Sequence, residues 1–498
     1  MNTPLSLLPG TPYPASLVEM GSMALWLVAT PQGKRLAVLA PFNSALVESF
    51  HGEVSELAGE RRRLLLSCPL DPANARALRF TLPNLQPAPL GLVTSAGFGD
   101  RLGLATPGHV RALHALRWVS TAHPGKAIAP IFAQQSGREL GRTGRSAEQV
   151  LADATWGAFE GGWRGLVGAD ADHLKTPADI DRFAAAGFSF FTIDPGAFVD
   201  SSAGGLGGVA LEHKAGTLPW PALESSLPDL RRRLDGKPFD LENHRLVLEG
   251  EQVLRAAVKY GAAVAHVTRL YRHLESKGIP FELEVSVDET ETPTTHAEHI
   301  YVANELQRLG VHWVSLAPRF VGRFEKGVDY IGDLDALAAD LAGHAAVARA
   351  LGPYKLSLHS GSDKFSVYPL AAAAAGGLLH LKTAGTSLLE GLRTLAQVEP
   401  GLFRKMLALS IERYPLERAS YHVSAELERV PDPASLPDVA LPALLDQFDA
   451  RQVLHVTFGS LLERYGSDLR RILSEHAEEY YQALERHFVR HLGLLMGD

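Results

Sequence analysis

The chain has 498 residues, of which 46% are hydrophobic and 21% are charged, so it is long and apolar enough to bury a large core. Its 48 basic and 56 acidic side chains give a formal charge of −8, which excludes a global basic field for binding nucleic acid or anionic lipid. Cys68 is the only cysteine, so a metal site would need histidine and carboxylate ligands.

Residues 1–90 are rich in proline and contain stretches with strand-like alternation. The segment begins without a basic region followed by a long apolar core, and no later run of about 18 apolar residues predicts a membrane span, so we expect a cytoplasmic protein. The stretches 24–41 and 75–83 predict short antiparallel strands. We therefore expect a small β-rich N-terminal cap over residues 1–90.

From residue 91 the pattern changes to short apolar runs that end in polar or glycine residues and alternate with helical patterns. This alternation is typical of a parallel α/β sheet. Eight such runs occur, at 90–97, 127–134, 163–170, 188–194, 279–288, 311–318, 354–360 and 378–385. They predict a TIM-type (β/α)8 barrel over residues 91–399, with its reactive groups at the C-terminal ends of the strands.

Three further segments complete the expected organisation. Residues 196–240 form a long insertion after the fourth strand, which we interpret as a lid, a contact in a homo-oligomer or a disordered excursion. The stretches 242–277 and 333–351 have helical patterns. Residues 400–498 predict a helical C-terminal extension, in which the apolar stripe of residues 467–495 packs on the barrel.

The alternation of side chains along each strand predicts which residues face the barrel axis. In residues 281–288 the apolar set faces the helices, which leaves Glu284 and Asp288 pointing inward. The same reasoning turns His359, Lys382 and Asp194 inward. The further side chains expected on the inner face are Asp170, Asp172, Thr192, Glu282, Ser286, Ser357 and His380.

So many buried ionisable groups are costly unless they are paired or coordinated. One interpretation is an internal salt-bridge network that fills the barrel floor, but contributions from four or five strands favour a functional cluster. Asp172 and His173 also fit the segment before a helix capped by Thr176, and for Asp172 both interpretations stay open. His380 comes earlier in its strand and fits a hydrogen-bonded core residue better than a ligand.

Two imidazoles and a carboxylate form a common site for a divalent ion such as Zn, Mn, Ni or Co. The spacing favours His173, Glu284 and His359 as the metal ligands. The sequence has no HExxH motif, GxSxG elbow or phosphate-binding loop, and the glycines of residues 204–208 lack the context of a nucleotide fold.

Long segments of the chain resemble the tagaturonate epimerases, which are also described as fructose 4-epimerases when they act on neutral ketohexoses. The likeness covers roughly residues 90–390 and implies a divalent-metal-dependent interconversion of D-tagaturonate and D-fructuronate. The segments that carry it are GFGDRLGLATPGH (97–109), FAQQSGRELGRTGR (132–145), DADHLKTP (170–177), FTIDPG (191–196), LEVSVDETETPTT (283–295), LAPRFVGRFEKGVDYIGD (316–333), SLHSGSDKFSVYP (357–369) and HLKTAGTS (380–387).

The implied reaction inverts a carbinol carbon β to the ketone, which simple enolisation cannot do. Two routes remain: retro-aldol cleavage followed by aldol addition, and transient hydride transfer to a nicotinamide cofactor. The sequence favours the first, because it has no dinucleotide fingerprint. On this hypothesis the candidates for proton transfer or hydroxyl binding are Asp172, Asp194, Asp288 and Lys382.

The implied substrate carries a carboxylate, which needs a cationic partner. Arg319, Arg323, Lys326 and Lys364 follow the sixth and seventh strands, although Arg323 and Lys326 also fit a solvated basic surface. Other residues expected at the mouth of the barrel are Asp100, Arg101 and Asp363, of which Asp363 is expected to hold substrate together with Lys364.

Two other functions compete with this interpretation. A metal-dependent ketose isomerase or aldolase on the same barrel would give an aldose or two fragments instead of an epimer. A noncatalytic sugar-binding protein would bind its ligand without turnover, although binding alone rarely needs so many titratable groups.

Overall fold

The computed structural model describes residues 4–57, 62–120, 127–242 and 244–496. Eight parallel strands close into a barrel in the order β12-β13-β14-β15-β6-β7-β8-β9, which confirms the predicted (β/α)8 fold. The strands are β6 Ser95–Gly99, β7 Ala129–Ser136, β8 Gly168–Leu174, β9 Phe190–Ile193, β12 Glu282–Ser286, β13 Ser315–Ala317, β14 Lys355–Leu358 and β15 Leu379–Lys382. All eight overlap the predicted runs, but the first begins at Ser95 instead of residue 90.

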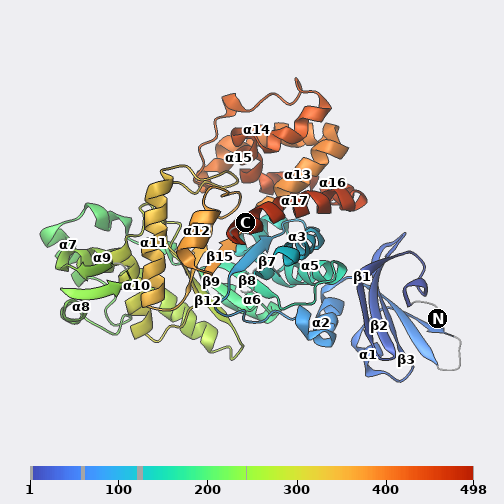
Figure 1. Ribbon diagram of the computed structural model, residues 1–498, viewed down its shortest axis with the longest axis horizontal. Helices are drawn as coiled ribbons and strands as arrows, with labels where there is room; N and C mark the ends of the chain where they lie inside the picture. The colour runs from blue at the N-terminus through green and yellow to red at the C-terminus, as the bar shows by residue number, and fades with distance from the viewer. Residues whose placement is uncertain (1–3, 58–61, 121–126, 243, 497–498) are drawn as a thin grey trace.

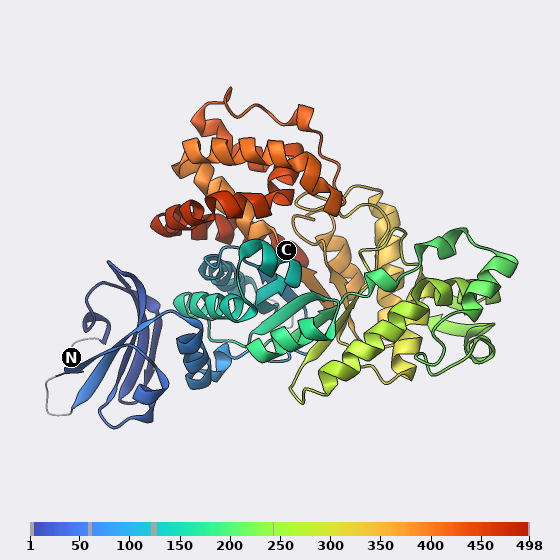
Figure 2. The ribbon, with the colours of Figure 1, turned by 180° about the vertical axis from the view of Figure 1, so that it is seen from behind.

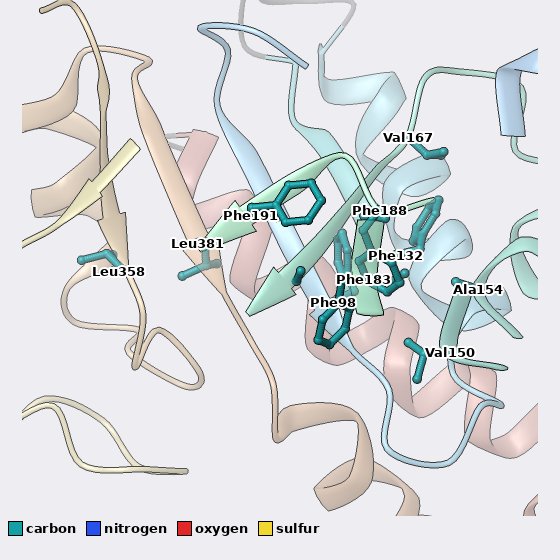
Figure 3. Packing of buried hydrophobic residues seen from close by; sticks show 14 of the residues in the cluster. Phe98, Phe132, Val150, Ala154, Val167, Phe183, Phe188, Phe191, Leu358 and Leu381 are labelled. Atoms are coloured by element: carbon teal, nitrogen blue, oxygen red, sulfur yellow. The ribbon is translucent and has the colours of Figure 1, made fainter. Parts of the chain in front are cut away.

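The outer face of the barrel carries the apolar half of each strand. Phe98, Phe132, Phe183 and Phe188 gather between strands and covering helices in Figure 3, and all four are buried. The ring of Phe98 has its centroid 5.8 Å from that of Phe132. Leu358 of β14 and Leu381 of β15 belong to the same apolar cluster, so the next residues, His359 and Lys382, point to the barrel axis, as predicted.

Helices surround the barrel and several begin at its mouth. They are α3 Thr106–Ser120, α4 Gly137–Thr143, α5 Ala147–Glu160, α6 Pro177–Ala186, α9 Gly250–Glu275, α10 His296–Arg308, α11 Leu334–Ala350, α12 Tyr368–Ala375 and α13 Thr386–Val398. Ser136, Thr176 and Thr295 each form a capping box that starts a helix just beyond the end of β7, β8 or β12. Local capping therefore fixes where the chain leaves the catalytic face of the barrel.

The N-terminal region is a five-stranded antiparallel sheet in the order β1-β2-β3-β5-β4. Its strands are β1 Thr11–Met20, β2 Met23–Thr30, β3 Gly33–Pro41, β4 Glu53–Leu57 and β5 Arg63–Pro69, with the short helix α1 Ala45–Ser49. The strand predicted at 75–83 is wrong, because these residues belong to helix α2, Pro72–Thr81. Asp71 caps this helix, Pro72 occupies its first turn, and Ala75 and Leu78 are buried at helical spacing.

The insertion after β9 is folded. It contains short 3-10 turns, the helices α7 Gly208–Gly216 and α8 Leu227–Leu234, and the hairpin β10 Lys237–Leu241 with β11 His244–Leu248. The hairpin occupies the start of the segment predicted as helix from 242, so α9 begins only at Gly250. Figures 1 and 2 show the insertion and the N-terminal sheet at the two far ends of the molecule, with the barrel between them.

The C-terminal extension is helical, as predicted. Its main helices are α14 Pro400–Glu417, α15 Phe448–Val456, α16 Phe458–Glu475 and α17 Ala477–Met496, and they pack on α3, α12 and α13 (Figure 1). The predicted stripe of residues 467–495 is divided between α16 and α17 at His476. Within the described part of the chain, every helix is too short or too polar to cross a membrane.

Candidate active site

One buried ammonium lies among three carboxylates inside the barrel. Nζ of Lys382 is 2.8 Å from Oδ2 of Asp170, 2.7 Å from Oδ1 of Asp172 and 2.9 Å from Oε1 of Glu284. The same nitrogen donates a hydrogen bond to Oγ1 of Thr192 at 2.6 Å. The side chain of Lys382 is 1% exposed, so its charge is neutralised by protein groups and not by water.

His359 connects this cluster to the next carboxylate. Its Nε2 lies 2.5 Å from Oε1 of Glu284, and its Nδ1 lies 3.3 Å from Oδ1 of Asp288. Ser286 donates a hydrogen bond of 2.6 Å to the same oxygen of Asp288. The imidazole ring is therefore fixed between two carboxylates that both come from β12 and the residues just after it.

His173 joins the site through a local break in strand geometry. Its φ of 53° lies in the left-handed region, and the pairing of β8 with β9 shifts register between Ala171 and Leu174. As a result Asp172 and His173, which are neighbours in sequence, both line the same cavity. Nδ1 of His173 lies 2.8 Å from Oδ1 of Asp172, and its ring centroid is 5.0 Å from that of His359.

The close charges control ionisation in the cluster. Burial opposes the ionisation of Asp172, but His173 and Lys382 outweigh it and hold the pKa of this carboxyl well below its usual range. Burial likewise opposes ionisation of Glu284, and Lys382 and His359 lower its pKa well below the usual range. For Asp170 burial dominates and raises the pKa to about 6.

The imidazole of His359 is shifted in the other direction. Burial and the positive charge of Lys382 disfavour its protonated form, but Asp288 and Glu284 outweigh both and raise the pKa of His359 to about 10. Carboxylates thus dominate the electrostatics of this part of the barrel. Such an environment stabilises any cation that enters it.

A cavity of about 410 Å³ opens at this mouth, a size that suits a small ligand. Asp172, His173, Asp194 and His359 line it, whereas Glu284 and Lys382 lie below its surface. Asp194 pairs with Lys175 at 3.0 Å and accepts a hydrogen bond from the backbone N–H of Gly196 at 2.8 Å. Among the described residues, those of the 196–240 insertion do not line this cavity, so the geometry gives no support to a lid.

Within the part of the chain that the structure describes, two groups of residues at the cavity could hold a metal. One consists of His173, Asp194 and Glu289, and the other differs from the predicted set by one member. Asp172, His173 and His359 each offer a ligand atom, and these atoms lie within 4.8 Å of one another. Nε2 of His173 is buried and has no hydrogen-bond partner in the described part of the chain. Glu284, the predicted third ligand, is outside this group, and its Oε1 contacts His359 and Lys382. The geometry therefore favours Asp172 over Glu284 as the carboxylate ligand.

Cationic side chains line another part of the same cavity. Arg101 pairs with Glu139 at 2.9 Å and stacks on Phe458, while its Nη1 has no hydrogen-bond partner among the described residues. Lys326 donates a hydrogen bond of 2.9 Å to Oγ of Ser360. The other lining cations are Arg138, Lys175 and Arg182. The cavity thus joins an acidic and imidazole-rich wall to groups that can bind an anion.

A second cavity of about 280 Å³ adjoins the first and shares Lys326 and His359 with it. Asp288, Arg319 and Arg323 line this second cavity. Arg319 lies with Nη1 3.5 Å from the carbonyl oxygen of Asp288, and the side chain of Arg323 is 58% exposed. Of the cations predicted after the sixth strand, Lys326 alone lines both cavities.

Three predicted substrate-binding residues are used inside the protein instead. The carboxylate of Asp100 accepts hydrogen bonds from the backbone N–H groups of Leu102, Gly103 and Ala105. Asp363 pairs with Arg451 at 2.8 Å and with His487 at 2.7 Å. Nζ of Lys364 donates to three backbone carbonyls, those of Glu325, Val328 and Ser362. These three side chains do not line the cavities at the mouth, because loop geometry turns them into the protein.

The structure also brings in residues that were not predicted. Gln134 lines the cavity, and both polar atoms of its buried amide lack a hydrogen-bond partner in the described residues. Gly97 makes room for it, since a Cβ at that position would lie 2.7 Å from Oε1 of Gln134. Glu289, Tyr421 and His455 also line the cavity, and the last two come from the C-terminal extension. Period-two alternation would place Gln134 on the side of Phe132, which packs outward, and an irregularity of β7 between Ile131 and Ala133 reverses this. No local pattern therefore indicates any of these four residues.

Comparisons with known proteins agree on the family. A model of the tagaturonate epimerase family matches residues 13–495. A curated tagaturonate/fructuronate epimerase of Thermotoga maritima is 39% identical over 492 residues, which cover 97% of each chain. The native crystal structure of the fructuronate-tagaturonate epimerase of Cohnella laeviribosi is 35% identical, has a TM-score of 0.88, and covers 99% of this chain and 97% of that one. A glycerol complex of the same enzyme has the same identity and TM-score and covers 97% and 96%. The chain therefore belongs to the tagaturonate epimerase family and is an isomerase.

Proposed function

We propose that this protein interconverts D-tagaturonate and D-fructuronate with the help of a divalent metal ion bound at the mouth of the barrel. The observation that carries the proposal is the composition of one cavity, in which Asp172, His173 and His359 lie near one another and Arg101 and Lys326 contribute positive charge. A ketohexuronate has both a polar carbonyl and hydroxyl end and a carboxylate, and this cavity has groups for each.

The proposed ligand set fits a borderline divalent ion such as Zn, Mn or Ni, since it consists of two imidazoles and one carboxylate. When bound, such an ion would act as a Lewis acid toward the ketone of the substrate. Asp288 orients one imidazole by accepting from its Nδ1 at 3.3 Å, and Asp172 contacts Nδ1 of the other at 2.8 Å. Nε2 of His173 is buried and makes no hydrogen bond to the residues that the structure describes, which supports this assignment.

We propose Asp194 as the base of a retro-aldol and aldol sequence. Its carboxylate lines the cavity and is oriented by Lys175 and by the N–H of Gly196. It removes the proton of the β-hydroxyl group, the carbon–carbon bond to the α-carbon breaks, and the electron pair of that bond moves into the ketone fragment as an enolate. The aldehyde formed turns its other face, the bond forms again, and Asp194 returns the proton to the new alkoxide.

Lys382 has a different role from the one expected on the sequence. It lies below the cavity with a 1% exposed side chain, so we propose that it neutralises Asp170, Asp172 and Glu284 and does not transfer protons to substrate. Removing it would leave three buried carboxylates with one counter-ion fewer. Glu284 takes part in this charge balance through Lys382, and the contact of its Oε1 with Nε2 of His359 would give way when that nitrogen binds the ion.

The substrate carboxylate is proposed to bind Arg101 and Lys326. Both line the cavity, and Nη1 of Arg101 is free of hydrogen bonds to the described residues. A charge-assisted hydrogen bond contributes about 1.5–3 kcal/mol, which corresponds to a change of about 10–100-fold in binding. Replacing Lys326 by Met should therefore raise KM for the ketohexuronates by about this factor and leave KM for D-fructose unchanged.

Arg323 provides the matched control for that substitution. It lies three residues away, lines only the second cavity and is largely exposed, so Arg323→Met should change neither KM. If Lys326→Met and Arg323→Met have equal effects on both sugars, a specific contact between Lys326 and the carboxylate is ruled out.

The reaction itself is tested with D-tagaturonate in deuterated water, with products followed by proton NMR. The retro-aldol route keeps the carbon-bound hydrogen at the inverted carbon, so D-fructuronate should form without deuterium there. Substrate deuterated at that carbon should react without a primary isotope effect, whereas a hydride route requires one. Accumulation of an aldose or of two fragments, or binding without turnover, would contradict the proposed function.

A further inference from the structure

A second group of histidine and carboxylate side chains lies away from both cavities. His296 is the first residue of α10, while Asp340 and His344 lie one turn apart on α11, and these two helices pack side by side (Figure 1). One ligand atom from each of the three residues lies within 4.8 Å of the others. The three residues do not belong to the lining of the cavities at the mouth.

The distances within this group suit a shared ion. Nε2 of His296 and Nε2 of His344 each lie 3.5 Å from Oδ1 of Asp340. Tetrahedral zinc has bonds of about 2.0–2.2 Å to nitrogen and oxygen, which places its ligand atoms about 3.3–3.6 Å apart. Nε2 of His344 is buried and lacks a hydrogen-bond partner in the described residues.

The groups around these side chains hold them in place. The other carboxylate oxygen of Asp340, Oδ2, accepts a hydrogen bond of 3.0 Å from the backbone N–H of Val321. Nδ1 of His344 lies 2.9 Å from Nδ1 of His299, whose Nε2 lies 2.8 Å from the hydroxyl of Tyr354. Partners of this kind orient the imidazole and carboxylate ligands in metal sites.

Gly343 is an independent sign that the position of His296 is built into the fold. A Cβ at residue 343 would lie 2.0 Å from Cε1 of the His296 ring, so any other residue there would displace the imidazole from α11. A helix interior usually disfavours glycine by about 1 kcal/mol relative to alanine. The close approach of the His296 ring accounts for its use here.

A similar group at the C-terminal helix α17 consists of Asp363, His487 and His491, and protein groups already contact its coordinating atoms. Asp363 there already pairs with Arg451 at 2.8 Å, and its backbone N–H donates to Nε2 of His491 at 3.0 Å. The coordinating atoms are thus occupied by protein groups. At His296, Asp340 and His344 the coordinating atoms are less occupied. Among the described residues, the one hydrogen bond that competes with an ion runs from Nε2 of His296 to the backbone carbonyl of Asp340 at 3.2 Å.

We propose that His296, Asp340 and His344 bind a divalent transition-metal ion such as Zn²⁺, with a fourth position for water, and that this ion fastens α10 to α11. Binding replaces the hydrogen bond from Nε2 of His296, and the neutral ring then carries its proton on Nδ1, so no other reactant is needed. The site is structural, and it is independent of the proposed catalytic ion.

The test is a count of bound ions on the full-length protein. Chelator-treated protein is titrated with Zn²⁺ and with Co²⁺, and the bound metal per chain is measured together with the visible absorption of Co²⁺ and the melting temperature. Wild type should bind one ion more than His296→Gln and one more than Asp340→Asn, and Zn²⁺ should raise the melting temperature of wild type more than that of either variant. Both variants should keep ketohexuronate turnover after reloading, since neither residue lines the cavities.

Two controls make the outcome decisive. His173→Gln should lose the ion proposed at the barrel mouth but keep this one, so a failure of the catalytic metal and a failure of the structural metal give different counts. If His296→Gln does not fold, Asp340→Asn carries the test, because its amide oxygen can still accept from Val321. Equal metal counts in wild type and in folded His296→Gln or Asp340→Asn would show a metal-free histidine cluster and overturn the proposal.

Discussion

Two buried lysines of the barrel lie in contrasting surroundings. Lys382 ends β15 and contacts the carboxylates of Asp170, Asp172 and Glu284, and these surroundings raise its pKa well above the usual range although burial opposes the charge. Lys364 follows β14 and, among the residues that the structure describes, donates to backbone carbonyls alone, and burial lowers its pKa to about 7. Both side chains are buried, yet only Lys382 contacts carboxylates of the proposed site.

The contrast teaches how a functional charge cluster differs from a structural one. Around Lys364 the donors and acceptors match, so that loop is closed on itself. Around Lys382 three carboxylates share one ammonium and one imidazole, and some polar atoms, such as Nε2 of His173, make no hydrogen bond within the described ranges of the chain. Unmatched buried groups are costly and are kept where a ligand completes them.

Substituting each lysine by methionine gives the largest expected difference. Lys382→Met leaves the three carboxylates short of a counter-ion, Asp172 among them, so ketohexuronate turnover should fall by about 100-fold and stability should fall by about 3–5 kcal/mol. Lys364→Met should also lose stability, through three unsatisfied carbonyls, but should retain turnover at temperatures where it stays folded. Turnover by NMR and thermal melts measure both; equal activity losses in the two variants would remove the distinction.

A substitution at Gln134, which lines the cavity, tests the same comparison at an uncharged side chain. Its buried amide makes no hydrogen bond to the described residues, so Gln134→Leu should leave stability unchanged or raise it by about 1 kcal/mol. Turnover should nevertheless fall by about 10–100-fold, because a hydrogen bond to a substrate hydroxyl is lost. A stabilised variant with full activity would mean that Gln134 has no contact with substrate.

A substitution at Asp363 tests the structural cluster, where we expect activity to change less than stability. Asp363→Asn weakens the contacts with Arg451 and His487 that join the loop after β14 to the C-terminal helices. We expect a loss of about 1–3 kcal/mol in the free energy of unfolding, with kcat within a few-fold of wild type. Denaturant unfolding and steady-state kinetics measure the two effects. Loss of catalysis at unchanged stability would move Asp363 into the active site.

The smallest effect is a change in the pH dependence of stability. The pKa of Lys364 is 10.5 in an ordinary setting and about 7 in the folded protein, because burial disfavours its charge. Between these values the unfolded chain binds a proton there that the folded chain has released, so this residue makes stability rise with pH. Between pH 7 and about 9.5 the change in melting temperature should therefore be more positive for wild type than for Lys364→Met. A parallel pH profile would contradict the low pKa.

Strand-borne groups of the site could be predicted from the sequence, since alternation fixes the direction of a side chain once the strand is recognised. Glu284, His359 and Lys382 converge on the barrel axis for this reason. Loop-borne groups could not be predicted in this way. Asp100 follows β6 as directly as Asp194 follows β9, and Asp363 and Lys364 lie in the loop after β14, but turns direct these three side chains into the protein. The direction of a loop side chain depends on contacts that are distant in sequence.

Two other features also depended on tertiary structure. Asp172 and His173 share one cavity because His173 has a positive φ, which alternation cannot anticipate. His455 and Tyr421 reach the cavity from a helical extension whose sequence shows only an apolar stripe. The resemblance to a family supplied the reaction, whereas the choice of Asp172 over Glu284 as a proposed metal ligand required coordinates.

The central claim is that the surplus of negative charge at the barrel mouth holds a divalent ion needed for epimerisation. The direct measurement is turnover of D-tagaturonate and bound metal per chain, determined on the same samples of wild type and His359→Gln, before chelation, after it and after reloading. The account predicts that chelation stops turnover, that reloading restores it in wild type alone, and that His359→Gln binds one ion fewer. Full turnover after exhaustive chelation, or a His359→Gln variant with the metal content and activity of wild type, would contradict it.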